Sequence, residues 1–399
     1  MASLARVAFY GAPRVPEMVG CIYVSRRNKA TQLTTTNYKR GTGGRSSFSG
    51  IVATVFGAKS TLGHMTVNRL GKVGSQVIIP YRGDPNHLCD LRVMGDLGQI
   101  LFHEFDLRDE ASIAKCMQYS NVVINLIGQN FETRNFSFDD VHVEGARRIA
   151  KLAKEMEVER LIHVSTMNAG VRSRNIVNTG SGFLKSKGRG EQAVLEEFPE
   201  AVILRPSSFV DINDRFLNYY TSKPRLSINY GGSRRNRVVH LWRNGEDTIK
   251  APVLPSDVAQ GIVNAIADPE AAGKIFQCVG PKFYKLSDLV DFMFRLRLQG
   301  VTLSQSGLPI VIAKAVAMEK VYKTIGFPYP KLTKDMLEKE TVSDVVDPSL
   351  PTLHDLGVVP GDIEDMMRYL NRPWLDAGIF KERVGVLMQP KGPAPVSLE

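Results

Sequence analysis

The stretch Ile51-Val-Ala-Thr-Val-Phe-Gly57-Ala-Lys-Ser60-Thr-Leu-Gly63-His64 decides the fold of this 399-residue chain. Its first six residues are mostly apolar and β-forming, which predicts a strand buried on both faces. Gly57 ends that strand and permits a tight turn, and Gly63 would let the following helix pack closely on the sheet. The free N–H groups at the start of that helix favour a pyrophosphate. The stretch therefore predicts a dinucleotide-binding turn.

Further strands and helices alternate along the next 150 residues or so, at the spacing of βαβ units. The predicted strands are Ile51–Phe56, Gln76–Pro80, Ile100–Phe105, Val122–Leu126, Leu161–Val164 and Val202–Leu204, with helical patterns at Leu62–Leu70, Glu110–Tyr119 and Val141–Met156. This order predicts an α/β fold with a doubly wound parallel Rossmann-type sheet.

The pattern changes beyond Pro206, and we predict three parts of the chain. Residues 1–45 form a leader, 50–280 the Rossmann domain with its substrate-side loops, and 281–390 a smaller, mainly helical C-terminal domain. Ser256 and Asp257 are suitable N-cap residues for a helix to Ala267, and Asp139-Asp140 for the helix after them. The loosely amphipathic segment Pro309–Ile325 fits either an ordinary helix or a surface that docks on a partner or on lipid headgroups.

The positive charge of the chain is concentrated at its N-terminus. Residues 1–49 carry eight Lys or Arg and a single acid, Glu17, so this segment supplies most of the net charge of +10. Its Arg-rich, Ser/Thr-rich composition predicts a mitochondrial presequence, with a disordered basic tail as the alternative. The remainder is nearly balanced, so we expect no nucleic-acid partner.

The sequence does not predict a metal site or a membrane span. The cysteines Cys21, Cys89, Cys116 and Cys278 form no CxxC pair, which favours structural thiols in a reduced compartment. The longest apolar stretch, Leu308–Met318, is interrupted by a lysine and is too short to cross a bilayer.

The predicted turn departs from the usual G-x-x-G-x-x-G spacing because Ser60 stands at the middle glycine. A side chain there would crowd the phosphate, and it would strain the backbone if φ were positive. On this interpretation Ser60→Gly should tighten nucleotide binding.

The ends of the next strands supply candidate cofactor residues. Arg82 follows the second strand, where NAD-binding proteins usually have an acid, so it favours the 2′-phosphate of NADPH; Asp84 leaves NAD as the alternative. Asp106 and Leu107 at the third strand would meet the adenine. Gly128, after the fourth strand, would let the backbone approach the ribose.

These residues resemble the atypical short-chain dehydrogenase/reductase family, and within it the NADPH-holding accessory subunits of mitochondrial respiratory complex I. The segments that carry the resemblance are Gly50–Ala58, Gln76–Arg82, Met94–Gln99, Ser120–Gly128, Phe131–Phe136, Ile162–Ser165, Asp214–Asn218, Gly261–Ala265 and Trp374-Leu375.

The resemblance implies a bound NADPH with a structural role, in a subunit on the matrix side of the mitochondrial inner membrane. Its partners would be other complex I subunits, with peripheral membrane contact. The pyrophosphate would lie over Gly57, Ser60, Thr61 and Leu62, with Arg82 at the 2′-phosphate, Asp106 near the adenine, and Gly128, Ser165 and Lys187 along the nicotinamide ribose.

Catalysis is not expected. Reductases of this superfamily use a Tyr-x-x-x-Lys pair, in which the phenol passes a proton to the substrate. The corresponding segment here is Phe183-Leu-Lys-Ser-Lys187, and no tyrosine occurs between residues 120 and 218. Two alternatives remain open: an atypical reductase or epimerase with another proton donor, and a scaffold that has lost its nucleotide.

Overall fold

The computed structural model describes residues 41–178, 180–211, 216, 219–220, 226–227, 236–297, 300–327, 329–371 and 390–397. All of these belong to one compact unit, residues 35–399. The predicted leader lies outside the described residues apart from its last five positions, as do most of Asp214–Asn218 and all of Trp374-Leu375.

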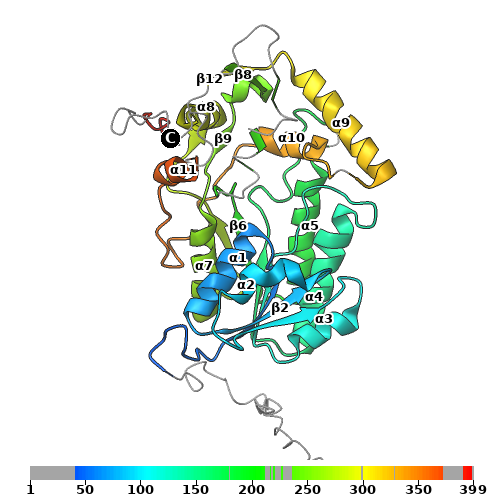
Figure 1. Cartoon of the computed structure of the whole chain (residues 1–399), viewed down its shortest axis with the longest axis vertical. Coiled ribbons are helices and arrows are strands. Elements are labelled where there is room, and N and C mark those ends of the chain that lie inside the picture. The colour runs from blue at the N-terminus through cyan, green and yellow to red at the C-terminus, as the bar shows by residue number, and fades with distance from the viewer. Residues whose placement is uncertain are drawn as a thin grey trace, which may run out of the picture. The chain divides into compact units, whose positions relative to one another are not determined.

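A seven-stranded parallel sheet forms the centre of the fold (Figure 1). Its order is β10-β6-β5-β4-β1-β2-β3, and every neighbouring pair is parallel. The strands are β1 (Val52–Phe56), β2 (Gln76–Tyr81), β3 (Ile100–Glu104), β4 (Val122–Asn125), β5 (Arg160–Val164), β6 (Val202–Pro206) and β10 (Ile275–Cys278). Strands β2 and β3 follow β1 on one side of it, and the next strand in the chain, β4, pairs with β1 on its other side. The strand order therefore reverses beside β1. The predicted doubly wound fold is confirmed.

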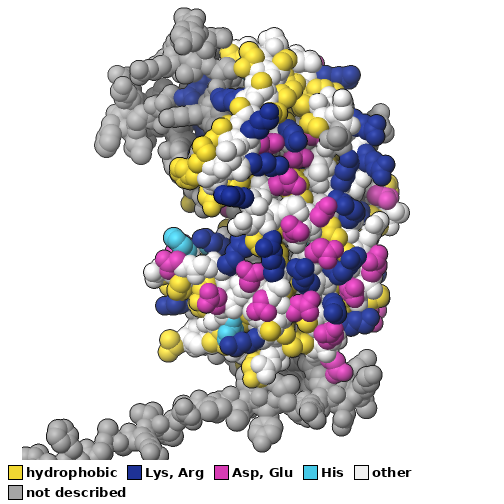
Figure 2. Space-filling view, turned by 90° about the vertical axis from the view of Figure 1, so that its right-hand side faces the viewer, with side chains coloured by type: hydrophobic (Ala, Val, Ile, Leu, Met, Phe, Trp, Pro, Cys, Tyr) yellow, Lys and Arg dark blue, Asp and Glu magenta, His cyan; other side chains and the backbone are white. Residues whose placement is uncertain are grey.

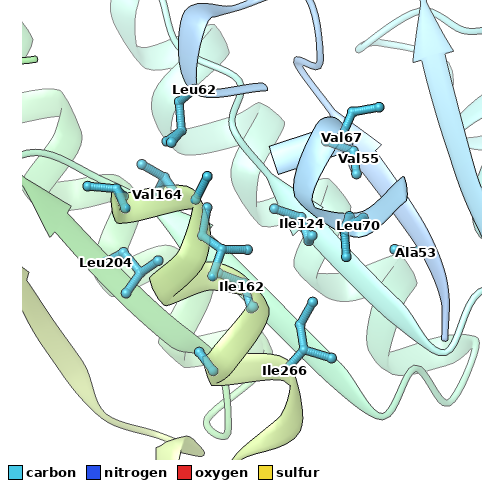
Figure 3. Close-up of a cluster of buried hydrophobic side chains, with 14 of the residues drawn as sticks. Ala53, Val55, Leu62, Val67, Leu70, Ile124, Ile162, Val164, Leu204 and Ile266 are labelled. Carbon is cyan, nitrogen blue, oxygen red and sulfur yellow. The ribbon is translucent and has the colours of Figure 1, made fainter. Parts of the chain in front are cut away.

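Successive residues of the central strands face opposite layers of helices. Val55 packs in one core with side chains of α1 (Thr61–Lys72) and α7 (Pro255–Ala267), as Figure 3 shows for part of this cluster. Phe56 packs in a second core with side chains of α3 (Glu110–Met117), α4 (Gly145–Glu155) and α5 (Gly182–Glu197). The apolar runs in the sequence thus reflect strands covered on both faces.

Two of the predicted helix starts, those at Asp139-Asp140 and at Ser256-Asp257, differ in detail from the structure. Asp139 makes no capping hydrogen bond, and its carboxylate pairs with Arg189. Asp140 accepts the N–H of Ser137 and opens a π-helical turn, Asp140–Glu144, before α4. Helix α7 begins at Pro255, with Leu254 at the N-cap, so Ser256 and Asp257 lie inside its first turn. The other short helices are Pro85–Leu88, α2 (Cys89–Arg92), Trp242–Gly245 and Pro269–Ala271.

The C-terminal part is mainly helical, as predicted, with α8 (Leu286–Leu296), α9 (Leu308–Ile325), α10 (Lys334–Thr341) and α11 (Ile363–Asn371). Two small sheets join it to the preceding loops: β7 (Leu226–Ser227), β8 (Asn236–His240) and β12 (Gly300–Ser304) form one, and β9 (Ile249–Lys250) with β11 (Tyr284–Lys285) the other. A separate apolar core, including Tyr284, Phe292 and Phe294, lies beneath these elements. Among the helices of the described residues, none is both long and apolar enough to span a bilayer.

Candidate functional site

The predicted glycine turn is built by two close backbone approaches. Gly57 has φ +80°, and a Cβ on it would lie 2.9 Å from the carbonyl carbon of Leu126, directly after β4. A Cβ on Gly63 would lie 2.5 Å from the backbone of Ala58, because α1 starts almost in contact with the turn. Both glycines are therefore required by geometry, as the sequence predicts.

Ser60 caps the helix, and the condition for strain at this residue, a positive φ, is not met. Its backbone is extended, with φ −72° and ψ 161°, a conformation open to every residue. The hydroxyl donates to the Gly57 carbonyl at 2.9 Å and accepts the Gly63 N–H at 3.0 Å. The side chain is thereby folded into the turn as an N-cap.

The start of α1 offers an anion site. Within the described part of the chain, no acceptor pairs with the N–H groups of Thr61 and Leu62. The first turn of this helix contains no acidic residue, so the partial positive charge of its N-terminus is uncompensated. A diphosphate would meet two donors here.

Residues at the ends of β2 and β3 lie at the same edge of the sheet as the turn. Arg82 is exposed, and its guanidinium carbon lies 5.3 Å from the centre of the Phe136 ring. Asp84, the residue that kept NAD open, caps the short helix Pro85–Leu88 by accepting the Asn86 N–H at 2.8 Å. Asp106 is exposed and accepts the Arg108 N–H through one oxygen, and Leu107 is buried against Gly145.

The residues expected along the nicotinamide ribose come together beyond β4 and β5. A Cβ on Gly128 would lie 3.3 Å from Lys187 Nζ, so glycine is needed to make room for the lysine. Lys187 is buried and donates to the Val164 carbonyl at 3.2 Å. Ser165 follows Val164 and is buried too, and its hydroxyl finds no hydrogen-bond partner among the described residues.

Burial sets the charge of this cluster. It lowers the pKa of Lys187 to about 8, although the nearby Glu191 carboxylate opposes the shift. Glu191 is itself held by Arg205 through two hydrogen bonds of 3.0 and 2.6 Å. Lys187 is thus a cation at neutral pH that titrates closer to the physiological range than an exposed lysine.

Two buried histidines complete the cluster, and the sequence did not indicate the role of either. His142 accepts the Gln129 N–H with Nε2 and pairs with the Ser186 hydroxyl through Nδ1. Burial, then the charge of Lys187, lowers the pKa of His142 to about 2, so the ring stays neutral. His163 is buried and pairs with Asn125, but its Nε2 has no partner in the described residues.

Phe183 occupies the position expected for a catalytic tyrosine. Its ring packs edge-on against His142 and Phe138, with ring centres 5.4 and 6.2 Å away, and the Lys339 ammonium lies 4.4 Å from its centre. No hydroxyl replaces the missing phenol among these four side chains. Of the hydroxyls in the cluster, that of Ser186 is bonded to His142 and to the Phe183 carbonyl, and that of Ser165 has no partner in the described residues.

A C-terminal segment, residues 334–347, closes the side of the site beyond β5 and β6; we call it the strap. Glu338 on α10 is fully buried and accepts hydrogen bonds from the Ser173 hydroxyl and from the N–H groups of Asn175, Ile176 and Val177. Asp344 lies 3.7 Å from Lys250 and accepts from Ser207 and Ala251. A small cavity of about 10 Å³ lies between the strap and the strand ends, and Thr166, Leu184 and Asp344 are among the residues that line it.

No cluster of metal-ligating side chains occurs in the described ranges. The thiols of Cys89, Cys116 and Cys278 are free. Burial raises the pKa of Cys116 to about 11, which keeps that thiol protonated and unreactive.

Comparisons with known proteins agree with this geometry. Residues 53–277 match the NAD dependent epimerase/dehydratase family. A mitochondrial NADH dehydrogenase [ubiquinone] 1 alpha subcomplex subunit 9 from Mus musculus is 46% identical over 85% of this chain and 86% of its own length. The mitochondrial NADH-ubiquinone oxidoreductase 40 kDa subunit of Neurospora crassa is 38% identical over 81% of this chain and 80% of its own.

Solved structures support the fold alone. An NADPH-dependent quinone oxidoreductase from Escherichia coli, in complex with NADPH, has a TM-score of 0.56 at 17% identity and covers 80% of this chain and 99% of its own.

Proposed function

The chain belongs to the NAD dependent epimerase/dehydratase family and to the family of the alpha subcomplex subunit 9 proteins. We propose that it is a non-catalytic accessory subunit of mitochondrial complex I and that it holds NADPH as a structural ligand. It would act in assembly or stability of the complex that passes electrons from NADH to ubiquinone. The proposal places it in the mitochondrion, on the matrix side of the inner membrane.

The phosphate turn carries the cofactor part of the proposal. Gly57 and Gly63 leave no room for side chains, and the N–H groups of Thr61 and Leu62 are aligned at the start of a twelve-residue helix. Ser60 does not obstruct this site, because its hydroxyl is bonded inside the turn. The residues fit a dinucleotide diphosphate.

The ends of β2 and β3 favour NADPH over NAD. A carboxylate that accepts both ribose hydroxyls is the usual feature of an NAD site. The Asp84 carboxylate is engaged in capping the next short helix, whereas Arg82 is exposed with its charge available to an anion. This charge suits a 2′-phosphate.

Two buried polar atoms support a ribose at the other end. The Ser165 hydroxyl and His163 Nε2 have no partner within the described residues, and such atoms cost free energy unless a ligand or water pairs with them. NADPH would supply a hydride donor at this end. Lys187 would hold the ribose hydroxyls, and Gly128 would admit the lysine.

The absence of catalysis in the proposal rests on two independent features. Phe183 cannot donate a proton, and neutral His142 already uses both ring nitrogens in hydrogen bonds. Lys339, Val342 and Asp344 of the strap line the small cavity beside Leu184, which would restrict the room for a substrate there. An active reductase or epimerase would need both features to change.

A retained nucleotide would stabilise the fold by mass action. A ligand present at 100 times its dissociation constant adds about 2.7 kcal/mol to the free energy of unfolding. The diphosphate turn and the Lys187 cluster belong to different halves of the sheet, so a bound dinucleotide would connect them. The nucleotide would thus stabilise the fold without taking part in a reaction, and this is what we mean by a structural role.

Helix α9 provides a surface for the membrane contact. It buries Leu308, Val311, Ala315 and Tyr322, and it exposes a second apolar row at helical spacing. That exposed row is Ile310, Ala313, Ala317, Val321 and Ile325, with Phe327 beyond the helix end. Lys314 and Lys320 are exposed beside it, a combination that suits anionic lipid headgroups. Figure 2 shows the side of the molecule that carries α9, with hydrophobic and basic side chains together in its upper part.

Two measurements test the proposal. Mass spectrometry of nucleotide released from the denatured, purified protein should detect NADPH in near-stoichiometric amount; NADH alone, or no nucleotide, would contradict the cofactor assignment. The tagged chain should co-migrate with complex I on native gels, and migration only as a free protein would refute the accessory role.

A further inference from the structure

Two guanidinium groups lie against the same aromatic ring at the edge of the candidate site. The guanidinium carbon of Arg108 is 4.3 Å from the centre of the Phe136 ring, and that of Arg82 is 5.3 Å from it. Arg82 comes directly after β2, and Arg108 comes four residues after β3. Phe136 belongs to the loop between β4 and the π-helical turn.

The charge of this pair is not compensated by an ion pair. Neither arginine is within salt-bridge distance of a carboxylate in the described part of the chain. Arg108 also donates to the Asn135 carbonyl, which fixes one edge of its guanidinium. Its charge is felt by Asp140, but that carboxylate accepts the Ser137 N–H and belongs to the start of the π-helical turn. Two cations without an ion-pair partner beside one ring make this edge of the sheet positive, which favours an anion there.

Phe136 is held rigidly enough to position both arginines. Its N–H and its carbonyl both bond to the Thr133 side chain, and the carbonyl also accepts the Thr133 N–H at 2.9 Å. The Gln129 amide donates to the carbonyls of Phe136 and Ser137 at 3.1 and 3.0 Å. The ring also packs against the core that contains Phe56 and Leu107.

We propose that Arg108 is a second specificity-determining residue, which binds the 2′-phosphate of NADPH together with Arg82, and that Phe136 is the positioning residue for both. The inference rests on the proposed NADPH site and extends it to a pair of residues outside the turn. A diphosphate over α1 places the adenosine ribose toward β2 and β3 in this fold, which is the edge these arginines share. A doubly charged phosphate would take two guanidinium donors, whereas a ribose hydroxyl would take neither as strongly.

The test compares NADPH with NADH on the purified mature chain, after removal of bound nucleotide. Titration of Arg108→Gln should show an NADPH dissociation constant about tenfold or more above that of the wild type, because a charge-assisted contact is lost, while the NADH constant should change by less than about twofold. Phe136→Leu should reduce the NADPH-to-NADH affinity ratio in the same direction, and Phe136→Tyr should restore it.

Arg92→Gln is the matched control. Its guanidinium lies 5.5 Å from the centre of the Phe102 ring, a similar stack away from the strand ends. This variant should leave the affinity ratio unchanged. If Arg108→Gln does not fold, Arg108→Lys, which keeps the charge but not the planar fork, should lower the ratio by a smaller factor.

The outcomes separate this inference from the proposed function. A wild-type chain that binds neither nucleotide would refute the NADPH site as a whole. A wild type that prefers NADPH, together with an Arg108→Gln variant that keeps the full preference, would overturn the role of Arg108. Loss of preference in Arg92→Gln as well would show that the effect is not specific to the pair.

Discussion

At the scale of single residues, Lys187 is the group whose chemistry depends most on its surroundings. Its side chain is buried, donates to the Val164 carbonyl, and lies against Gly128. The protonated form is disfavoured by burial, so the folded protein holds a lysine with a lowered pKa in the absence of ligand. A nucleotide, which is negatively charged and rich in acceptors, would reverse that cost.

The pKa of Lys187 predicts a pH dependence of stability. In the folded chain it is about 8, below the ordinary lysine value of 10.5, so the unfolded chain binds more protons between these values. The free energy of unfolding of the nucleotide-free protein should therefore rise as the pH increases from about 8 to about 10.5, by on the order of 1–3 kcal/mol from this group. Denaturant unfolding of the wild type and of Lys187→Met across this range measures the difference. A difference that falls with pH would contradict the burial argument.

Ser60 gives a prediction opposite to the one drawn from its sequence alone. Because φ is −72°, glycine relieves no strain, so Ser60→Gly should change the NADPH dissociation constant by less than about threefold. Ser60→Ala should lower the free energy of unfolding by about 1 kcal/mol through loss of the cap on α1. Titration and thermal unfolding of both variants provide the check, and markedly tighter binding in the glycine variant would restore the crowding hypothesis.

At the scale of elements, α10 and the strap hold the loop after β5 in place. Glu338 is the acceptor for four donors in residues 173–177, and it is separated from them by 161 to 165 positions in the sequence. Asp335, on the same helix, accepts the N–H of Gly182 at the start of α5. These contacts fix the helix that carries both Phe183 and Lys187.

Removal of the Glu338 carboxylate should loosen this loop selectively. We expect Glu338→Ala to lower the free energy of unfolding by roughly 2–4 kcal/mol, because several buried donors lose their partner, and Glu338→Gln to have a smaller effect. Hydrogen exchange should increase at residues 173–177 before it increases in β1 and β4. Uniform acceleration across the sheet would mean that Glu338 supports only global stability.

The central sheet could be predicted from sequence because each strand is a short apolar run followed by a local turn signal. Strands β10 and β12 are among those not predicted, and both lack this signal. Ile275–Cys278 pairs with β6 at the sheet edge, with one further bridge from Gln277 to Thr352, and Gly300–Ser304 pairs with β8, 64 residues earlier in the chain. Their partners are set by tertiary packing.

The residues of the candidate site also fall into two groups: some are indicated by local sequence spacing, and others are brought into place only by tertiary packing. Gly57, Gly63 and Lys187 could be proposed from sequence because their expected roles depend on spacing within one turn or one helix. Arg108 and His142 acquire their roles only when the loop after β4 folds over β2 and β3 and when α5 packs beside it. The strap was missed for the same reason, since nothing near Glu338 in sequence indicates its four donors.

At the scale of the whole molecule, the C-terminal region closes a site that the Rossmann half alone would leave open. Restoration of the phenol should therefore not restore catalysis. Phe183→Tyr should leave NADPH oxidation in the presence of small ketones or quinones at the level of Lys187→Met, because Lys339, Val342 and Asp344 of the strap line the small cavity beside Leu184 and restrict substrate access. Stopped-flow absorbance at the reduced nicotinamide band measures this. Turnover in the tyrosine variant that disappears in the double variant Phe183→Tyr/Lys187→Met would show that the strap opens in solution.

The hydrogen bond from Asn168 to Asp344 joins residues 176 positions apart. Since a ribosome delivers the amino end first, the glycine turn is complete while the strap has still to be made. A nascent or truncated chain that ends before residue 334 thus has the glycine turn that would bind the diphosphate, but it lacks the strap beside the Lys187 cluster. Premature stop codons late in the reading frame should consequently yield a protein that captures dinucleotide and then loses it quickly.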